Sequence, residues 1–382
     1  MRNWLLPENI QDILPPEAQR VEYLRARLLE LFRVHGYLFV MPPMLEYVES
    51  LLTGTGEDLD LRTFKLVDQI SGRMMGLRAD ITPQVARIDA HLLNRVGVAR
   101  LSYCGSVLHT RARGQDSTRE PVQIGAEIYG HAGIESDLEI QTLLFKALSA
   151  CGRNDARIDI GHVAVFRALC RHGKVDADLE RRLLAALVSK DIPEVTELSA
   201  SLDGRVGEAL RLLPKLYGAH GVLADAKRYL PDLPEIHAAL TDLERLTDGA
   251  SYDVSIDLAD LRGYRYHSGV VFSAYVPGRA SAVALGGRYD EVGKAFGRAR
   301  PATGFSMDLM DFASGVGGIQ VRRGILCPLV DDGELRNLVD RLRAEGEIVI
   351  AELPGHEQAN NELGCDRTLV LDSGVWHVRA IQ

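Results

Sequence analysis

Residues 257–290 read DLADLRGYRYHSGVVFSAYVPGRASAVALGGRYD. Apolar residues alternate with polar ones at 252–258 and again at 269–276, a pattern typical of half-buried β-strands, and a third run ends in Gly-Gly-Arg-Tyr-Asp. A polar corner separates the first two runs and contains Arg262, Arg265, Tyr264, Tyr266 and His267. The stretch therefore predicts an antiparallel sheet that carries a polar pocket.

Arg262 and Gly263 indicate what such a pocket could hold. A fixed guanidinium group can bind a carboxylate or a phosphate through two hydrogen bonds, and a glycine lets the backbone approach a ligand closely. On these two residues alone, a surface hairpin with arginine for solubility and tyrosine for packing is an equal alternative.

The composition is that of an ordinary globular protein. With 382 residues and 46% hydrophobic residues, we expect two or three domains with a large core. The formal net charge of -9 argues against a polyanion such as tRNA as the main partner. The five cysteines lack metal-ligand spacing, and no run approaches the ~18 apolar residues of a membrane span. We therefore expect a cytoplasmic chain with reduced thiols, no metal and no cofactor.

The N-terminal third predicts one long helix followed by short strands. Apolar residues at helical spacing predict an amphipathic helix over 15–35. The apolar run 37–41 is followed by two prolines, which suits a strand at the edge of a sheet. Residues 63–67 and 73–77 predict a hairpin across Ser-Gly.

The next polar residues allow two interpretations. Asp80 and Thr82 precede a helix that Pro83 can open, so they could simply cap free backbone amides. Gln123 and Glu127 are four residues apart on a predicted strand, so both face the same side of the sheet. That side could be a solvated face or the wall of a ligand site.

The remainder of the chain predicts two further parts. A capping-box pattern predicts that a helix begins at Ser136, and residues 177–247 predict an inserted helical subdomain. Residues 325–380 predict a small strand-helix-strand unit followed by two more strands. We expect one domain over 1–318 and a second over 319–382.

Five motifs, in order along the chain, resemble those of histidyl-tRNA synthetases, which belong to class II of the aminoacyl-tRNA synthetases. The resemblance implies an α+β fold in which helices flank an antiparallel sheet, with the helical insertion and a shortened C-terminal α/β remnant. It also implies that histidine binds with its amino group at the acid and threonine, its imidazole at the glutamate and its carboxylate at the arginine. The residues that match are Asp80, Thr82, Gln123, Glu127, Arg262 and Tyr266, with His267 at the position of a second tyrosine.

Two departures from the synthetase pattern fall on residues that would bind ATP. His109 stands where motif 2 has an arginine that holds the α-phosphate, and Asp311 stands where motif 3 has a second arginine. A neutral histidine cannot supply a permanent forked cation. We expect Asp311 to repel a triphosphate by ~1 kcal/mol or more.

This combination resembles the regulatory subunits of ATP phosphoribosyltransferase, which are non-catalytic paralogues of the synthetases. The resemblance implies a role in the first step of histidine biosynthesis, with feedback inhibition by L-histidine. It also implies a mixed octamer with the short catalytic subunit. The helix, strand and two prolines of residues 15–43 resemble motif 1 of the class II synthetases, which implies a homodimer formed through this segment. The alternatives are an active histidyl-tRNA synthetase, the catalytic transferase subunit itself and a free-standing histidine sensor.

Overall fold

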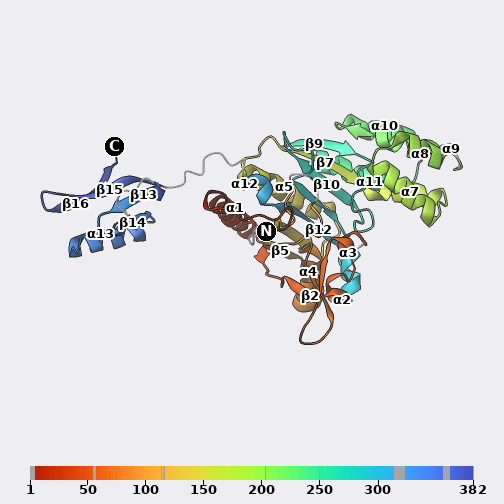
Figure 1. Cartoon of the computed structure of the whole chain (residues 1–382). Helices are drawn as coiled ribbons and strands as arrows, with labels where there is room; N and C mark the ends of the chain where they lie inside the picture. The colour runs from red at the N-terminus through yellow and green to blue at the C-terminus, as the bar shows by residue number, and fades with distance from the viewer. Residues whose placement is uncertain are drawn as a thin grey trace. The chain divides into compact units, whose positions relative to one another are not determined.

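The chain divides into two compact units, residues 1–316 and 317–382 (Figure 1). Each unit has its own hydrophobic core. The computed structural model describes residues 5–54, 57–112, 114, 117–202, 204–248, 250, 252–313, 323–355 and 362–381. The division lies close to the one proposed from sequence at 318/319.

A nine-stranded sheet is the framework of the larger unit. Its strands lie in the order β1-β5-β6-β12-β11-β10-β7-β9-β8. Neighbours are antiparallel except for the pairs β1/β5 and β7/β9, so the prediction of a largely antiparallel sheet is confirmed. The strands are β1 (Leu38–Phe39), β5 (Ala99–Ser106), β6 (Val122–Tyr129), β7 (Arg157–His162), β8 (Tyr217–Gly218), β9 (Asp253–Asp257), β10 (Val270–Tyr275), β11 (Ala284–Arg288) and β12 (Ala302–Asp308).

Helices outside and inside the predicted insertion share the main core with the sheet. The predicted spacing in the first helix is confirmed, because Leu24, Leu28 and Phe32 on one face are fully buried. Phe32 packs edge-on against Phe305 of β12, with ring centroids 5.9 Å apart. The helices are α1 (Pro15–Val34), α5 (Ile134–Ala150), α6 (Val163–His172), α11 (Pro234–Thr247) and the short α12 (Met310–Ala313).

A second cluster of buried side chains surrounds the start of α4 (Thr82–Arg87). It joins Ile81 and Val85 to Leu101, Tyr103 and Tyr289. The π-helix η1 (Ile88–Leu93) and the 3₁₀ helix η3 (Val292–Phe296) pack beside α4. A three-stranded antiparallel sheet, which contains the predicted hairpin, and two short helices complete this region: β2 (Leu45–Tyr47), β3 (Phe64–Val67), β4 (Met74–Leu77), α2 (Val48–Leu51) and α3 (Glu57–Arg62).

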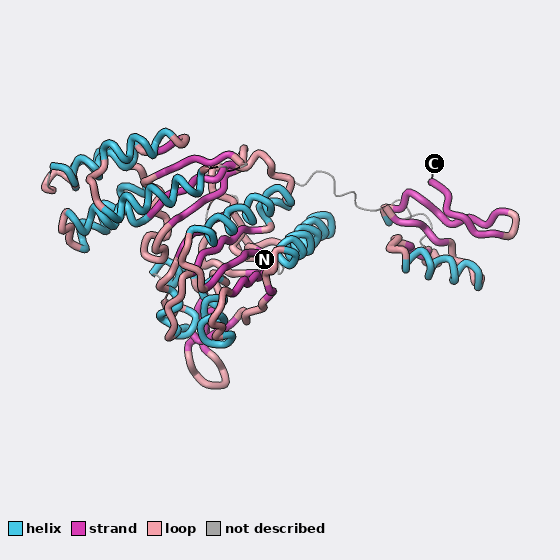
Figure 2. Tube along the Cα trace, turned by 180° about the vertical axis from the view of Figure 1, so that it is seen from behind, coloured by secondary structure: helices cyan, strands magenta, loops and turns pink. Residues whose placement is uncertain are grey.

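The insertion is helical except for one short strand, β8, which joins the end of the main sheet. Figure 2 shows these helices gathered beside the last strands of the sheet. Their apolar faces join the main core through residues such as Leu183, Leu210 and Leu240. The helices are α7 (Ala177–Val188), α8 (Ile192–Leu198), α9 (Gly204–Leu212), η2 (Leu213–Lys215) and α10 (Gly221–Tyr229), followed by α11.

The predicted start of α5 at Ser136 is wrong, because the helix begins at Ile134. Ser136 is already inside the helix, and its hydroxyl donates to the carbonyl of Gly133 at 2.9 Å. Arg288 donates to Ser136 Oγ at 2.9 Å and to Asp137 Oδ2 at 2.6 Å. The polar pattern therefore serves a buried ion pair rather than a helix cap.

The smaller unit has a four-stranded sheet in the order β14-β13-β15-β16, with α13 packed on it. Asp332 caps this helix, since its carboxylate accepts from the backbone amide of Glu334 at 2.8 Å. Within the described ranges, every helix of the chain is too short or too polar to cross a membrane. The elements, as predicted, are β13 (Gly324–Cys327), α13 (Gly333–Ala344), β14 (Val349–Ala351), β15 (Cys365–Asp372) and β16 (Val375–Ala380).

Candidate functional site

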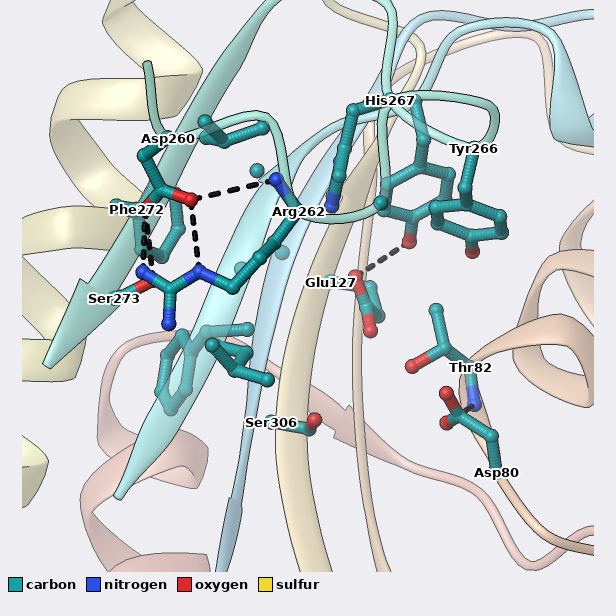
Figure 3. A pocket seen from close by; sticks show the side chains of 18 of the residues that line it. Asp80, Thr82, Glu127, Asp260, Arg262, Tyr266, His267, Phe272, Ser273 and Ser306 are labelled. Atoms are coloured by element: carbon teal, nitrogen blue, oxygen red, sulfur yellow. Dashed lines mark hydrogen bonds and ion pairs between the residues drawn. The ribbon is translucent and has the colours of Figure 1, made fainter. Parts of the chain in front are cut away.

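A cavity of about 200 Å³ opens on one face of the large sheet (Figure 3). Its floor is formed by the middle of β10, β11 and β12 together with Glu127 of β6. The loop after β9 and the segment before α4 form its walls. All seven predicted residues come together here, from positions almost two hundred residues apart in the chain. Six of them line the cavity, and Gln123 donates a hydrogen bond to one of the six, Asp80: the six are Asp80, Thr82, Glu127, Arg262, Tyr266 and His267.

Asp80 forms the acidic end of the cavity. Its Oδ1 accepts from the backbone amide of Thr82 at 3.0 Å and from Nε2 of Gln123 at 2.9 Å. The other end of the Gln123 amide accepts from the backbone amide of Ile81 at 2.9 Å, which fixes its orientation. Asp80 therefore caps a backbone amide, as one interpretation predicts, and it also lines the cavity. Ligand binding by Asp80 stays a prediction.

Glu127 is a buried carboxyl group, exposed by only 1%, so the alternative of a solvated strand face is wrong. Its Oε2 accepts from the hydroxyl of Tyr289 at 2.5 Å and its Oε1 from that of Tyr103 at 3.2 Å. Burial raises the pKa of Glu127 to about 8, and the two tyrosine hydroxyls offset only part of this effect. An N–H donor of a ligand would favour the ionised form.

Gly304 of β12 makes room for Glu127. A Cβ atom at this position would lie 1.5 Å from Glu127 Oε2, which no side chain can tolerate. The glycine in the motif at 301–311 is therefore required by the carboxyl group on the neighbouring strand, with which it pairs.

The imidazole of His267 is held as an acceptor. Its Nδ1 lies 3.2 Å from the carbonyl oxygen of Arg288, which can only accept, so Nδ1 carries the proton and Nε2 is left as an acceptor. Burial lowers the pKa of His267 to about 4, so the ring is neutral near pH 7. Gly263 and Gly287 leave space for this ring, because a Cβ atom on either would come within 3 Å of it.

Tyr266 contributes an unsatisfied hydroxyl group. Its oxygen is buried and has no hydrogen-bond partner among the described residues. The ring packs against that of Tyr289, with centroids 5.0 Å apart. A buried hydroxyl without a partner costs about 1–3 kcal/mol, so a polar ligand atom at this place would be stabilised.

Arg262 lines the cavity but is already engaged. Its Nε and Nη2 donate to the two carboxylate oxygens of Asp260 at 2.8 and 2.5 Å (Figure 3). Asp260 also accepts from Ser273 Oγ at 3.3 Å, and its side chain is only 4% exposed. The prediction that Arg262 meets a ligand carboxylate stays a prediction, and any such contact would have to share this pair.

Arg62 lines the same cavity from the end of α3 and is not among the residues predicted from sequence. Its Nη2 lies 2.8 Å from Nε2 of His109. A wider groove of about 790 Å³ adjoins the cavity and is lined by Arg62 and by Arg181 of α7. Arg62 belongs to none of the quoted motifs, and its local sequence carried no signal that would have identified it.

The two positions that depart from the ATP-binding pattern, 109 and 311, have different surroundings. His109 is buried, with Nε2 also 2.9 Å from the carbonyl oxygen of Ala79. Asp311 is paired with Arg279, whose Nη2 lies 2.7 Å from Asp311 Oδ1. The neighbouring guanidinium balances the charge of Asp311, and the expected repulsion of a triphosphate stays a prediction. Within the described part of the chain, no cluster of three or more His, Cys, Asp or Glu residues could hold a metal ion.

Two family models match the chain. The model described as "Histidyl-tRNA synthetase" matches residues 9–312. The model described as "ATP phosphoribosyltransferase subunit HisZ C-terminal domain" matches residues 322–379.

The chain is also similar to curated proteins and solved structures along almost its whole length. ATP phosphoribosyltransferase regulatory subunits of Ralstonia nicotianae and Cupriavidus necator are 59% and 57% identical, over 99% and 98% of this chain and 98% of each relative. The crystal structure of an ATP phosphoribosyltransferase regulatory subunit/histidyl-tRNA synthetase from Bacillus halodurans C is 27% identical, with a TM-score of 0.84 over 94% of this chain and 96% of that one.

A histidyl-tRNA synthetase from Nostoc sp. PCC 7120 has the same fold, with a TM-score of 0.79, 18% identity and coverage of 99% of this chain and 97% of that one. The expected class II synthetase-like fold is thereby confirmed. Because a synthetase-type domain and its C-terminal companion both match, and full-length relatives exceed half identity, the chain belongs to the family of ATP phosphoribosyltransferase regulatory subunits.

Proposed function

We propose that this chain is the non-catalytic regulatory subunit of an ATP phosphoribosyltransferase, which acts with a short catalytic subunit in the first step of histidine biosynthesis. One observation carries the proposal. A polar cavity is retained on the sheet, while histidine and aspartate occupy positions 109 and 311, where an active synthetase has phosphate-binding arginines. This favours a subunit that binds a ligand over an enzyme that activates an amino acid.

The proposed ligand is L-histidine. Asp80, with Thr82 and Gln123 beside it, offers oxygen acceptors for an ammonium group. The carboxyl group of Glu127, the Tyr266 hydroxyl and Nε2 of His267 also line the cavity. These groups suit an imidazole, which has one nitrogen that donates a hydrogen bond and one that accepts. The proposed histidine-binding residues are Asp80, Thr82, Gln123, Glu127, Arg262, Tyr266 and His267.

Feedback inhibition then follows from linkage. Histidine can lower the transferase rate only if it binds one state of the complex more tightly than the other. With a coupling free energy of roughly 1–3 kcal/mol, histidine would bind one state of the complex about 5 to 150 times more tightly than the other. His267 offers only an acceptor where a tyrosine hydroxyl could also donate, so this replacement would weaken or redirect the contact with the imidazole of histidine.

The proposed partners are copies of this chain and the catalytic subunit, as a mixed octamer in the cytoplasm. An exposed apolar edge supports the homodimer, since Leu38, Phe39 and Met41 at the β1 end of the sheet are 49%, 41% and 78% exposed. The net charge of -9 argues against tRNA as a partner.

Calorimetric titration of histidine, with and without the short catalytic subunit, tests this function together with the transferase rate. We expect the rate to need this chain and to fall as histidine saturates it. A rate that is indifferent to this chain would contradict the proposal. Pyrophosphate exchange driven by histidine and ATP would instead identify an active synthetase.

A further inference from the structure

His267 limits the hydrogen bonds that a ligand ring can make on its side of the cavity. Its Nδ1 lies 3.2 Å from the carbonyl oxygen of Arg288, so this nitrogen carries the ring proton and Nε2 can only accept. Burial lowers the pKa of His267 to about 4, which keeps the ring neutral near pH 7. A ligand nitrogen that meets Nε2 must therefore carry a hydrogen.

Glu127 is a second group on the same cavity that an imidazole can meet. Figure 3 shows the His267 ring and the Glu127 side chain pointing into this space. Within the protein the Glu127 carboxyl group accepts from the hydroxyls of Tyr103 and Tyr289, at 3.2 and 2.5 Å. Toward a ligand it can accept when it is ionised or donate when it is protonated.

An imidazole that meets both groups has only one arrangement of hydrogens left. The nitrogen that faces His267 must be an N–H, so the second nitrogen of a neutral ring bears a lone pair. An ionised Glu127 would then place two acceptors against each other. A single proton between this nitrogen and the carboxyl group removes the repulsion, whichever of the two atoms holds it. The complex therefore needs one proton more than a neutral imidazole and an ionised Glu127 bring to it.

Tyr266 is the group that could remove this need, because its buried hydroxyl lacks a partner among the described residues and could donate to the second nitrogen. Burial raises the pKa of Tyr266, and the nearby carboxyl groups of Glu127 and Asp80 add to this effect, so the hydroxyl keeps its proton. A hydrogen bond to an ionised acceptor is stronger than one to a neutral acceptor. We therefore expect the Tyr266 hydroxyl to turn to a carboxylate rather than to a neutral ring.

Other titratable groups around this pair do not supply the proton. Burial raises the pKa of each nearby tyrosine further above its ordinary value of 10.0, so the tyrosines stay neutral up to pH 9, and arginines stay charged. The titratable and charged groups that face Glu127 and His267 are Tyr37 before β1, Arg62 of α3, Asp80 before α4, Tyr103 of β5, Tyr129 of β6, Arg167 of α6, Asp260, Arg262 and Tyr266 of the loop after β9, and Tyr289 after β11.

We propose that the imidazole of the ligand binds as a pair with Glu127 that shares one proton, while His267 accepts the N–H of the other ring nitrogen. His267 is then the residue that determines the protonation state in which the ligand is held. The inference rests on the proposed function, because it requires that the cavity binds histidine.

The test counts the protons taken up when histidine binds to the full-length chain. Calorimetric titrations at pH 9, in two buffers that differ in ionisation enthalpy, give this number for the wild type and for His267→Gln. The glutamine amide both donates and accepts, so a neutral imidazole can donate to an ionised Glu127 and accept from the amide. The wild type should therefore take up about one proton more than the variant, and its affinity should fall up to about tenfold more per pH unit. The α-amino group of histidine contributes equally to both titrations.

His162→Gln is the matched control. His162 of β7 is also buried, and its Nδ1 accepts from the backbone amide of Ala164 at 3.2 Å, so the same substitution there should keep the wild-type proton uptake. Tyr266→Phe should also keep the wild-type uptake, whatever its affinity. If His267→Gln binds no histidine, His267→Tyr, which also offers a donor, takes its place in the comparison.

Equal proton uptake in the wild type and in the variants at position 267 would overturn the proposal and leave histidine binding, and so the proposed function, intact. An uptake that rises in Tyr266→Phe would also overturn it, because Tyr266 would then be the donor to the second ring nitrogen. A wild-type chain that binds no histidine at any pH would instead contradict the proposed histidine site.

Discussion

Glu127 is almost completely buried and lines the cavity. Its carboxyl group accepts from Tyr103 and Tyr289, yet burial still raises its pKa to about 8. Near pH 7 the carboxyl group is therefore mainly protonated without a ligand. An imidazole N–H next to it would compensate the ionised form, so ligand binding and ionisation of Glu127 are linked.

Glu127 should make the free energy of unfolding depend on pH. The folded-state pKa of Glu127 lies above the unfolded value near 4.5, so between about pH 4.5 and 8 the folded protein holds a proton that the unfolded chain has released. This contribution to stability falls as pH rises, by up to ~1.4 kcal/mol per pH unit. Glu127→Gln cannot release a proton, so the variant should gain stability relative to wild type from pH 5 to 8, as measured by urea unfolding.

Glu30→Gln provides the control for this prediction. Hydrogen bonds from the guanidinium of Arg33 to the Glu30 carboxylate lower its pKa, so it is ionised in both states above about pH 5. The difference in free energy of unfolding between wild type and this control variant should be constant from pH 5 to 8. A wild-type minus Glu127→Gln difference that is equally flat would show that Glu127 is ionised in the folded protein at pH 5.

At the scale of elements, the loop between β9 and β10 joins the cavity to the helical insertion. Tyr264 OH donates to Glu180 of α7 at 2.7 Å. Arg167 of α6 donates to the carbonyl oxygens of Tyr264 and His267 at 3.2 and 3.1 Å. A shift of this loop on ligand binding would therefore be felt by α6 and α7, which gives the proposed regulation a physical route.

We expect the isolated chain to form a dimer through the edge strand β1. Phe39 is 41% exposed on the outermost strand of the sheet, where an apolar surface and unpaired backbone groups favour association with a second copy. Phe39→Glu should convert a dimer of the isolated chain into a monomer, as measured by light scattering after size exclusion. Burying an unpaired carboxylate in an interface is unfavourable.

Tyr229→Glu places the same charge at another exposed aromatic position, on α10, and should leave the dimer intact. If Phe39→Glu stays dimeric while the wild type is a dimer, the interface lies elsewhere. A monomeric wild type would show that the isolated chain does not use this edge.

The cavity belongs to only one of the two units of the chain. All residues that line the cavity belong to the first unit, 1–316, which has its own core. A chain that ends at residue 316 should therefore fold and bind histidine within about threefold of the full-length affinity, measured by calorimetry. A folded but non-binding fragment would place part of the histidine site in residues 317–382.

Much of the fold could be predicted from sequence because the signals are local. Apolar spacing over 15–35 requires one helix face to be buried, and alternation at 269–276 requires a strand. The start of α5 was misplaced because Ser136 and Asp137 match a cap pattern but bind Arg288, which lies about 150 residues later. A helix cap can be recognised from about four consecutive residues, whereas an ion-pair partner far away in the chain cannot be recognised in this way.

Local patterns in the sequence are enough to predict the order of the elements and, through the motif positions, three residues that meet in one cavity, Asp80, Glu127 and Tyr266. The pairing of charges over long distances in the chain follows only from folding. Folding joined Arg279 to Asp311 and brought Arg62 into the cavity. The physical reason is that backbone periodicity is set by neighbours in the chain, while the electrostatic state of a side chain is set by whatever folding places a few ångströms away.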